Sequence, residues 1–226
     1  MKNTVKLLAL AAAMTVASAA SAQQTAGTWL VTAGVNKITP KVESGDVSAP
    51  ALPGTKTDVG SDTKPRVTLG YMFTDNISVE ADAGLPYKHE LSGAGSIQGT
   101  GKLATAEVLP PTVFIQYRFL KAESMFRPYV GLGFTYAMFQ KERGSGQLTS
   151  ILNTGGPGAT FKLDDKAAAS FQIGGTMKIN EKWFLDASVI KTKLKTTAHY
   201  STGQTQEVRL DPLAVNFSIG YAFKGF

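Results

Sequence analysis

Large apolar residues occupy every second position along most of this chain. The run at 213–223 is the clearest case, with Leu213, Val215, Phe217, Ile219, Tyr221 and Phe223. The residues between them are small or polar. A period of two is typical of a β-strand whose two faces meet different environments. The chain is therefore expected to be all-β.

Eight such segments follow one another, at 29–39, 64–73, 77–87, 103–119, 126–139, 167–179, 183–198 and 205–223. Short turns at 74–76, 120–125 and 180–182 alternate with mostly long connections at 40–63, 88–102, 141–166 and 199–204, which are rich in Gly, Ser, Thr and Pro. This pattern predicts an eight-stranded antiparallel transmembrane β-barrel with short periplasmic turns and long extracellular loops.

An exported soluble β-sandwich is the alternative architecture, and it would place polar residues on its solvated face. Here the second face of each segment is rich in Gly, Ala, Ser and Thr, which suits a narrow lumen. Aromatic residues recur beside the short turns, as an interfacial girdle requires: Trp29, Tyr71, Phe73, Tyr117, Phe119, Trp183, Tyr221 and Phe223. The membrane barrel is therefore favoured.

The N-terminus carries the only continuous apolar stretch. Lys2 and Lys6 precede an apolar run at 7–16, and Ala20-Ser21-Ala22 forms an A-x-A cleavage site. This pattern indicates a signal peptide at 1–22, a barrel at 23–226 and localisation in the bacterial outer membrane. The 226-residue chain has no cysteine, which excludes a thiolate metal site. A net charge of +6 without clustering does not indicate a nucleic-acid partner.

Four stretches resemble motifs of the OmpW family of outer-membrane proteins: 70–77 with Glu80, 109–112, 127–131 and 208–212. Their order and spacing match across essentially the whole mature chain. The resemblance implies an eight-stranded barrel that helps small hydrophobic molecules cross the outer membrane.

The C-terminus departs from that family. Its members commonly end on the aromatic of a Gly-Tyr-x-Phe sequence, whereas here residues 220–223 are followed by Lys224, Gly225 and Phe226. Only a count back from Phe223 places large residues at every second position. We therefore expect the barrel-assembly machinery to recognise a strand ending near Phe223, with a short periplasmic tail after it.

Inward-facing residues near the short turns are charged: Arg66, Glu80, Asp82, Arg118, Arg127, Lys178 and Asp186. In a confined lumen opposite charges are expected to pair, because an unpaired buried charge is too costly. We interpret them as a plug that closes the periplasmic end and stabilises the lumen. The alternative is a pathway for ions.

Inward-facing residues near the long loops are apolar: Ile38, Val108, Pro110, Ala137, Phe139, Ile190, Leu194, Val208 and Leu210. One hypothesis is a ligand-binding pocket that is open to the outside and closed below. The alternative is that these side chains simply pack against each other or against the loops.

Three prolines indicate a weak point in the wall. Pro110 and Pro111 interrupt one strand, where proline removes ladder hydrogen bonds, and Pro86 lies at a similar height on the neighbouring strand. Local opening there would let an apolar ligand leave sideways into the membrane. The alternative is a simple bulge or strand end.

The remaining polar residues give weaker signals. His89 and His199 fall in expected loops without the spacing of metal ligands, so we predict no metal, no cofactor and no enzymatic activity. Lys191, Lys193 and Lys195, with Lys88, could bind lipopolysaccharide phosphates or form a solvated strand extension.

Taken together, the sequence predicts a passive facilitator whose partners are small hydrophobic solutes, outer-membrane lipids and lipopolysaccharide. A non-transporting barrel that acts as a receptor or adhesin through its extracellular loops is the alternative. A lipid-modifying barrel enzyme is the remote third hypothesis.

Overall fold

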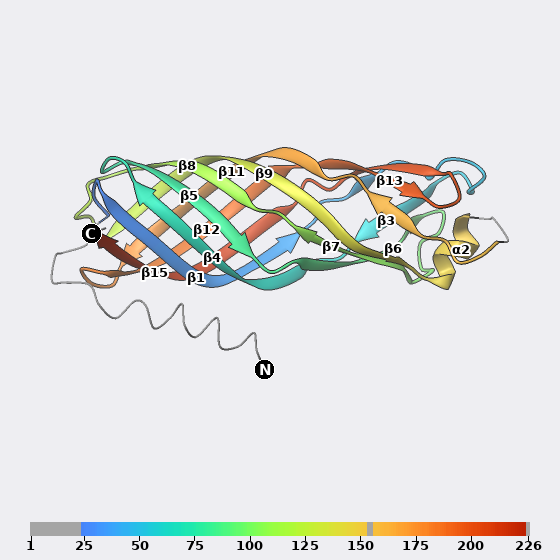
Figure 1. Cartoon of the computed structure of the whole chain (residues 1–226), viewed down its shortest axis with the longest axis horizontal. Coiled ribbons are helices and arrows are strands. Elements are labelled where there is room, and N and C mark those ends of the chain that lie inside the picture. The colour runs from blue at the N-terminus through green and yellow to red at the C-terminus, as the bar shows by residue number, and fades with distance from the viewer. Residues whose placement is uncertain (1–23, 153–155, 225–226) are drawn as a thin grey trace.

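The computed structural model describes residues 24–152 and 156–224, which form a closed antiparallel β-barrel (Figure 1). Its wall consists of β1 (Thr28–Thr39), β4 (Asp62–Met72), β5 (Ile77–Gly84), β8 (Thr112–Arg118), β9 (Phe126–Gly144), β11 (Lys166–Lys178), β12 (Trp183–Lys193) and β15 (Leu213–Lys224). Each strand pairs with the next one in this order, and β15 pairs with β1. The predicted architecture is confirmed, whereas the signal peptide lies outside the described residues.

The two faces of the wall meet different environments, as the alternation requires. Outward-facing Leu132 and Ile173 are 64% and 70% exposed in the isolated protein, whereas inward-facing Thr68 and Gln172 are each 1% exposed. Aromatic rings pair across strands at the short-turn end, with Trp29 and Tyr71 at 4.9 Å between ring centroids. A lipid bilayer is the environment that covers such an apolar band with an aromatic border.

Smaller elements extend the barrel beyond the long-loop end, on the right of Figure 1. They are β2 (Glu43–Ser44), β3 (Thr55–Val59), β6 (Tyr87–Gly95), β7 (Lys102–Leu109), α2 (Gly146–Leu152), β10 (Phe161–Leu163), β13 (Lys195–Tyr200) and β14 (Thr205–Arg209). Strand β7 pairs with the upper part of β9, β6 pairs with β7, and β3 pairs with β6. Strands β10, β13, β14 and β2 form a separate sheet. The regions expected as plain loops therefore contain much regular structure.

Four of the expected segments are divided in the structure. The divisions fall at Pro86, at Pro110 with Pro111, at Leu194 and before Leu213. Proline lies in three of them, since Pro212 directly precedes Leu213, and a proline nitrogen cannot donate to the ladder. At the C-terminus β15 includes Lys224, which pairs with Thr28, so Lys224 belongs to the strand and not to the expected tail. Within residues 24–152 and 156–224, no helix is long and apolar enough to cross a membrane.

Inward-facing aromatic rings lie over glycines on neighbouring strands. A Cβ atom on Gly220 would lie 2.1 Å from the ring of Phe184, and one on Gly133 would lie 2.5 Å from the ring of Phe114. Both rings are almost completely buried. The glycines thus create the space that lets a narrow lumen hold aromatic side chains.

Gly220→Ala should therefore lower the free energy of unfolding by about 1–3 kcal/mol, because the added methyl group overpacks the lumen against Phe184. Gly70→Ala is the matched control, since a Cβ there would meet its nearest neighbour at 3.4 Å, an ordinary contact. Urea unfolding of both variants in lipid vesicles, followed by the gel shift of the folded barrel, measures the difference. Equal stability of the two variants would contradict the packing argument.

Candidate functional site

An apolar cavity of about 110 Å³ occupies the long-loop end of the barrel. This volume is several times the ~10–15 Å³ that one water molecule needs. All the residues expected to form a pocket line it except Ala137: Ile38, Val108, Pro110, Phe139, Ile190, Leu194, Val208 and Leu210. Ala137 is fully buried and packs in the same apolar cluster. The upper lumen therefore contains open space as well as packed side chains.

The roof of this cavity comes from residues that the sequence analysis did not single out. Leu103 on β7, Leu148 on α2 and Phe161 on β10 all line it. They belong to a second apolar cluster, at the tip of the molecule, which also holds Leu152. In the sequence, the one available signal for these roof residues is that they are large and apolar within stretches rich in Gly and Ser.

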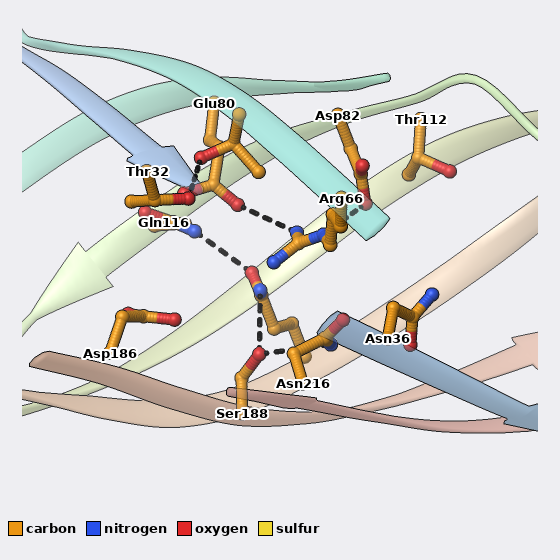
Figure 2. A network of polar contacts seen from close by, with 12 residues as sticks. Thr32, Asn36, Arg66, Glu80, Asp82, Thr112, Gln116, Asp186, Ser188 and Asn216 are labelled. Carbon is orange, nitrogen blue, oxygen red and sulfur yellow. Dashed lines mark hydrogen bonds and ion pairs between the residues drawn. The ribbon is translucent and has the colours of Figure 1, made fainter. Parts of the chain in front are cut away.

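The floor of the cavity is polar and belongs to the barrel wall. Asn36, Asp82, Thr112, Thr135 and Thr192 line it. Figure 2 shows Asn36, Asp82 and Thr112 pointing into the interior beside the network below. Three consecutive contacts join side-chain oxygens around the wall: Thr112 to Thr135 at 2.8 Å, Thr135 to Ser170 at 2.7 Å and Ser170 to Thr192 at 2.7 Å.

Below this floor the first expected plug residues meet (Figure 2). Arg66 donates to Asp82 at 2.7 Å and to Glu80 at 3.3 Å, and its side chain is only 2% exposed. Burial of a charge is tolerated only with such partners, and removal of one partner leaves the others uncompensated. Arg66 therefore holds two carboxylates that lie two residues apart on β5 and would otherwise repel each other.

Two further arginines fill the lumen toward the short turns. Arg118 donates to Gln116 at 2.7 Å and lies 4.8 Å from the ring centroid of Tyr129, whose hydroxyl donates to Asp186 at 2.9 Å. Arg127 donates to backbone carbonyls, including that of Gln24 at 2.8 Å. In the same region the Nε2 of Gln116 donates to the Oε1 of Gln172 at 2.8 Å.

Lys178 lies apart from these ion pairs. Its Nζ is 3.4 Å from Glu181 in the turn after β11, and the side chain is partly exposed. The other expected plug residues lie in the lumen, with Asp82 at the floor of the cavity and Arg66, Glu80, Arg118, Arg127 and Asp186 between that floor and the short-turn end.

The ladder of the wall is interrupted where the prolines lie. Between β5 and β8 pairing stops at Asp82 and Thr112, and between β6 and β7 it resumes at Tyr87 and Val108. On the side that faces β9 the wall stays joined, since the Tyr136 amide of β9 donates to the Pro111 carbonyl at 3.0 Å. Pro110 lines the cavity, so the interruption and the cavity adjoin each other.

His89 differs from the expected polar loop residue. It lies in β6, is 6% exposed and lines the cavity, with Nδ1 2.7 Å from the carbonyl oxygen of Gly60. Burial lowers the pKa of this imidazole, so it is neutral at pH 7. His199 is exposed and lies 3.3 Å from Asp164. Among the described residues no group of three or more His, Asp or Glu could hold a metal ion.

Comparison with known proteins adds independent evidence. The model of the OmpW family matches residues 25–223. Outer membrane protein W of Vibrio cholerae is 37% identical, and the alignment covers 99% of this chain and 100% of that protein. Dibenzothiophene metabolism operon protein DoxH of Pseudomonas sp. is 27% identical over 76% of this chain and 77% of its own length. The crystal structure of OprG from Pseudomonas aeruginosa matches with a TM-score of 0.79 and 29% identity, covering 89% and 98% of the two chains.

Arg66→Met should lower the free energy of unfolding by about 3–5 kcal/mol, because Glu80 and Asp82 would remain buried without a counter-charge. Lys195→Met is the control, because Lys195 pairs with Glu207 at 2.6 Å but both side chains are more than half exposed. That exposed pair should contribute little. Urea unfolding in lipid vesicles measures both variants, and equal losses would contradict the importance of the buried pair.

Proposed function

The chain belongs to the OmpW family of outer-membrane proteins, and on that premise we propose that it is a passive facilitator for small hydrophobic molecules. The observation that carries this proposal is an apolar cavity at the long-loop end, above a lumen filled with paired polar side chains. A solute from outside would exchange water for the apolar walls, which is favourable at about 25 cal/mol per Å² of apolar surface. Transport down a gradient needs no further energy source.

The chemistry of the cavity supports this class of solute. Most of its lining residues are aliphatic or aromatic, and the hydroxyl groups among the others hydrogen-bond within the protein, which suits a site for small apolar molecules. The name of the relative DoxH refers to the metabolism of dibenzothiophene, an apolar aromatic heterocycle. Such a molecule has the character that these walls would bind.

The exit is the second part of the proposal. The filled lumen leaves no direct route toward the short turns, so the solute would leave sideways between residues 83–86 and 109–111. Pro86, Pro110 and Pro111 lie beside the interrupted ladder, and Pro110 also lines the cavity. Opening a wall that already lacks hydrogen bonds costs less than breaking a complete ladder. The outer face at this height is apolar, with Leu85 55% exposed.

The two contacts with the envelope expected from the sequence remain part of the proposal. The assembly machinery would recognise β15, whose Phe223 faces Trp29 across the ladder. Lipopolysaccharide phosphates would meet the lysines at the long-loop end, among which Lys88 and Lys193 are exposed.

Val208→Trp should reduce uptake of naphthalene to near the rate of protein-free vesicles, because the indole would fill the cavity. Val215→Trp is the matched control, since Val215 is 52% exposed on the outer face. The measurement uses vesicles with lipopolysaccharide in the outer leaflet and a fluorescent readout of internal naphthalene. Wild-type protein that passes potassium chloride in preference to naphthalene would contradict the proposed function.

Replacing Pro110 and Pro111 together, by Thr and Val, should slow naphthalene uptake while leaving its binding intact. The new backbone N–H groups would allow the wall to close. Pro128→Ala is the control, because Pro128 lies in the continuous β9–β11 ladder opposite Gly175. Unchanged uptake by a correctly folded double variant would refute the sideways exit and leave the cavity proposal standing.

A further inference from the structure

The hydroxyl groups on the cavity floor form a chain whose hydrogen bonds run in one direction. The Thr112 hydroxyl donates to the carbonyl oxygen of Pro110 at 3.1 Å, which uses its only proton. The contact between Thr112 and Thr135 therefore requires Thr135 to donate. By the same count Ser170 donates to Thr135, and Thr192 donates to Ser170. The hydroxyl protons of Thr112, Thr135, Ser170 and Thr192 are therefore all used within the protein.

The other hydroxyl groups on the cavity wall follow the same rule. Thr57 and Tyr200 both donate to Oε1 of Gln206, at 3.0 and 2.9 Å, and Thr196 donates to the carbonyl of Asp164 at 2.8 Å. The Nδ1 atom of His89 faces a carbonyl oxygen and must carry the ring proton. Its Nε2 atom is then left with a lone pair.

Acceptor atoms, in contrast, remain unused at the floor. Asn36 is 6% exposed and its Nδ2 donates one of its two protons to Tyr87 at 2.8 Å, but its Oδ1 has no partner among the described residues. Thr192 ends the hydroxyl chain and accepts no hydrogen bond from the described side chains. Asp82 lines the cavity and uses only Oδ2 for Arg66.

From this count we propose that the cavity selects hydrophobic molecules that carry one hydrogen-bond donor, such as a phenol or a long-chain alcohol. The donor group would meet Thr192 at the floor and, once the Asn36 side chain turns toward the cavity, Asn36 Oδ1, and the apolar body would fill the space above. The inference rests on the proposed function and adds a polar requirement to it.

The same arrangement disfavours two other classes of solute. Ethers, esters and ketones offer only acceptors, so they would leave the Oδ1 of Asn36 unpaired even where the second N–H of its amide reaches their oxygen. Carboxylates would also meet Asp82 and Glu107, and the described lining residues include no Lys or Arg. An unpaired buried polar group is unfavourable by enough to reverse a preference between molecules of equal size.

Two isomers test this selectivity, 4-ethylphenol as the donor and 4-methylanisole as the acceptor-only molecule, with 4-ethyltoluene as the apolar reference. Equilibrium dialysis against nanodiscs with and without the protein gives each Kd corrected for partition into lipid. We expect 4-ethylphenol to bind roughly three- to tenfold more tightly than 4-methylanisole, the range that one net hydrogen bond supports.

Asn36→Leu should bring this ratio close to one while 4-ethyltoluene binds at least as well as before. Asn216→Leu is the matched control, because Asn216 faces Asn36 in the β1–β15 ladder, is also buried and also has an unpartnered Oδ1, but does not line the cavity. Thr192→Val is a second variant and should lower the ratio too. If Asn36→Leu does not fold, the ratio measured for Thr192→Val tests the donor requirement.

The outcomes separate this inference from the proposed function. If 4-ethyltoluene binds but the two isomers bind equally to wild-type protein, the donor requirement is wrong and the apolar cavity stands. If none of the three probes binds, the proposed function itself fails. A ratio that falls equally in Asn36→Leu and Asn216→Leu would also overturn the assignment to Asn36.

Discussion

The continuous ladder between β1 and β15, from Thr28 with Lys224 to Thr39 with Leu213, closes the sheet and sets the conditions for everything inside it. Closure with eight strands leaves a lumen that side chains fill or that holds one small ligand. Each large inward side chain must therefore lie over a small residue or make polar contacts. Gly220 under Phe184 and Arg66 between its two carboxylates are two solutions to this constraint. The cavity exists because the inward side chains become apolar and the wall gains a second tier of strands above them.

Much of this could be predicted from the sequence, because two-residue periodicity reports directly on which face of a strand a residue occupies. The parity that placed Ile190 and Leu194 inside the barrel holds in the structure. Position along the strands, near the short turns or near the long loops, separated the charged lower lumen from the apolar upper lumen. It did not place Lys178, whose long flexible side chain reaches Glu181 in the neighbouring turn.

The short strands beyond the long-loop end could not be predicted from the sequence, for a physical reason. Short strands such as β2 and β3 are held by pairing with segments far away in the chain, and they lie in a stretch at 40–63 whose Gly, Ser, Thr and Pro content resembles that of loops. The burial of His89 and the roof formed by Leu148 depend on those long-range pairings. Likewise, the direction of the hydroxyl chain depends on one carbonyl, that of Pro110, which no residue pattern reveals.

The filled lower lumen has a consequence for the cell as a whole. Salts, sugars and most antibiotics are polar, and under the proposed function the interlocked arginines, carboxylates and amides below the cavity would leave them no aqueous path. The number of copies in the envelope could then rise without weakening its permeability barrier. A water-filled pore of wider bore would force a compromise between solute passage and protection, which the proposed facilitator would avoid.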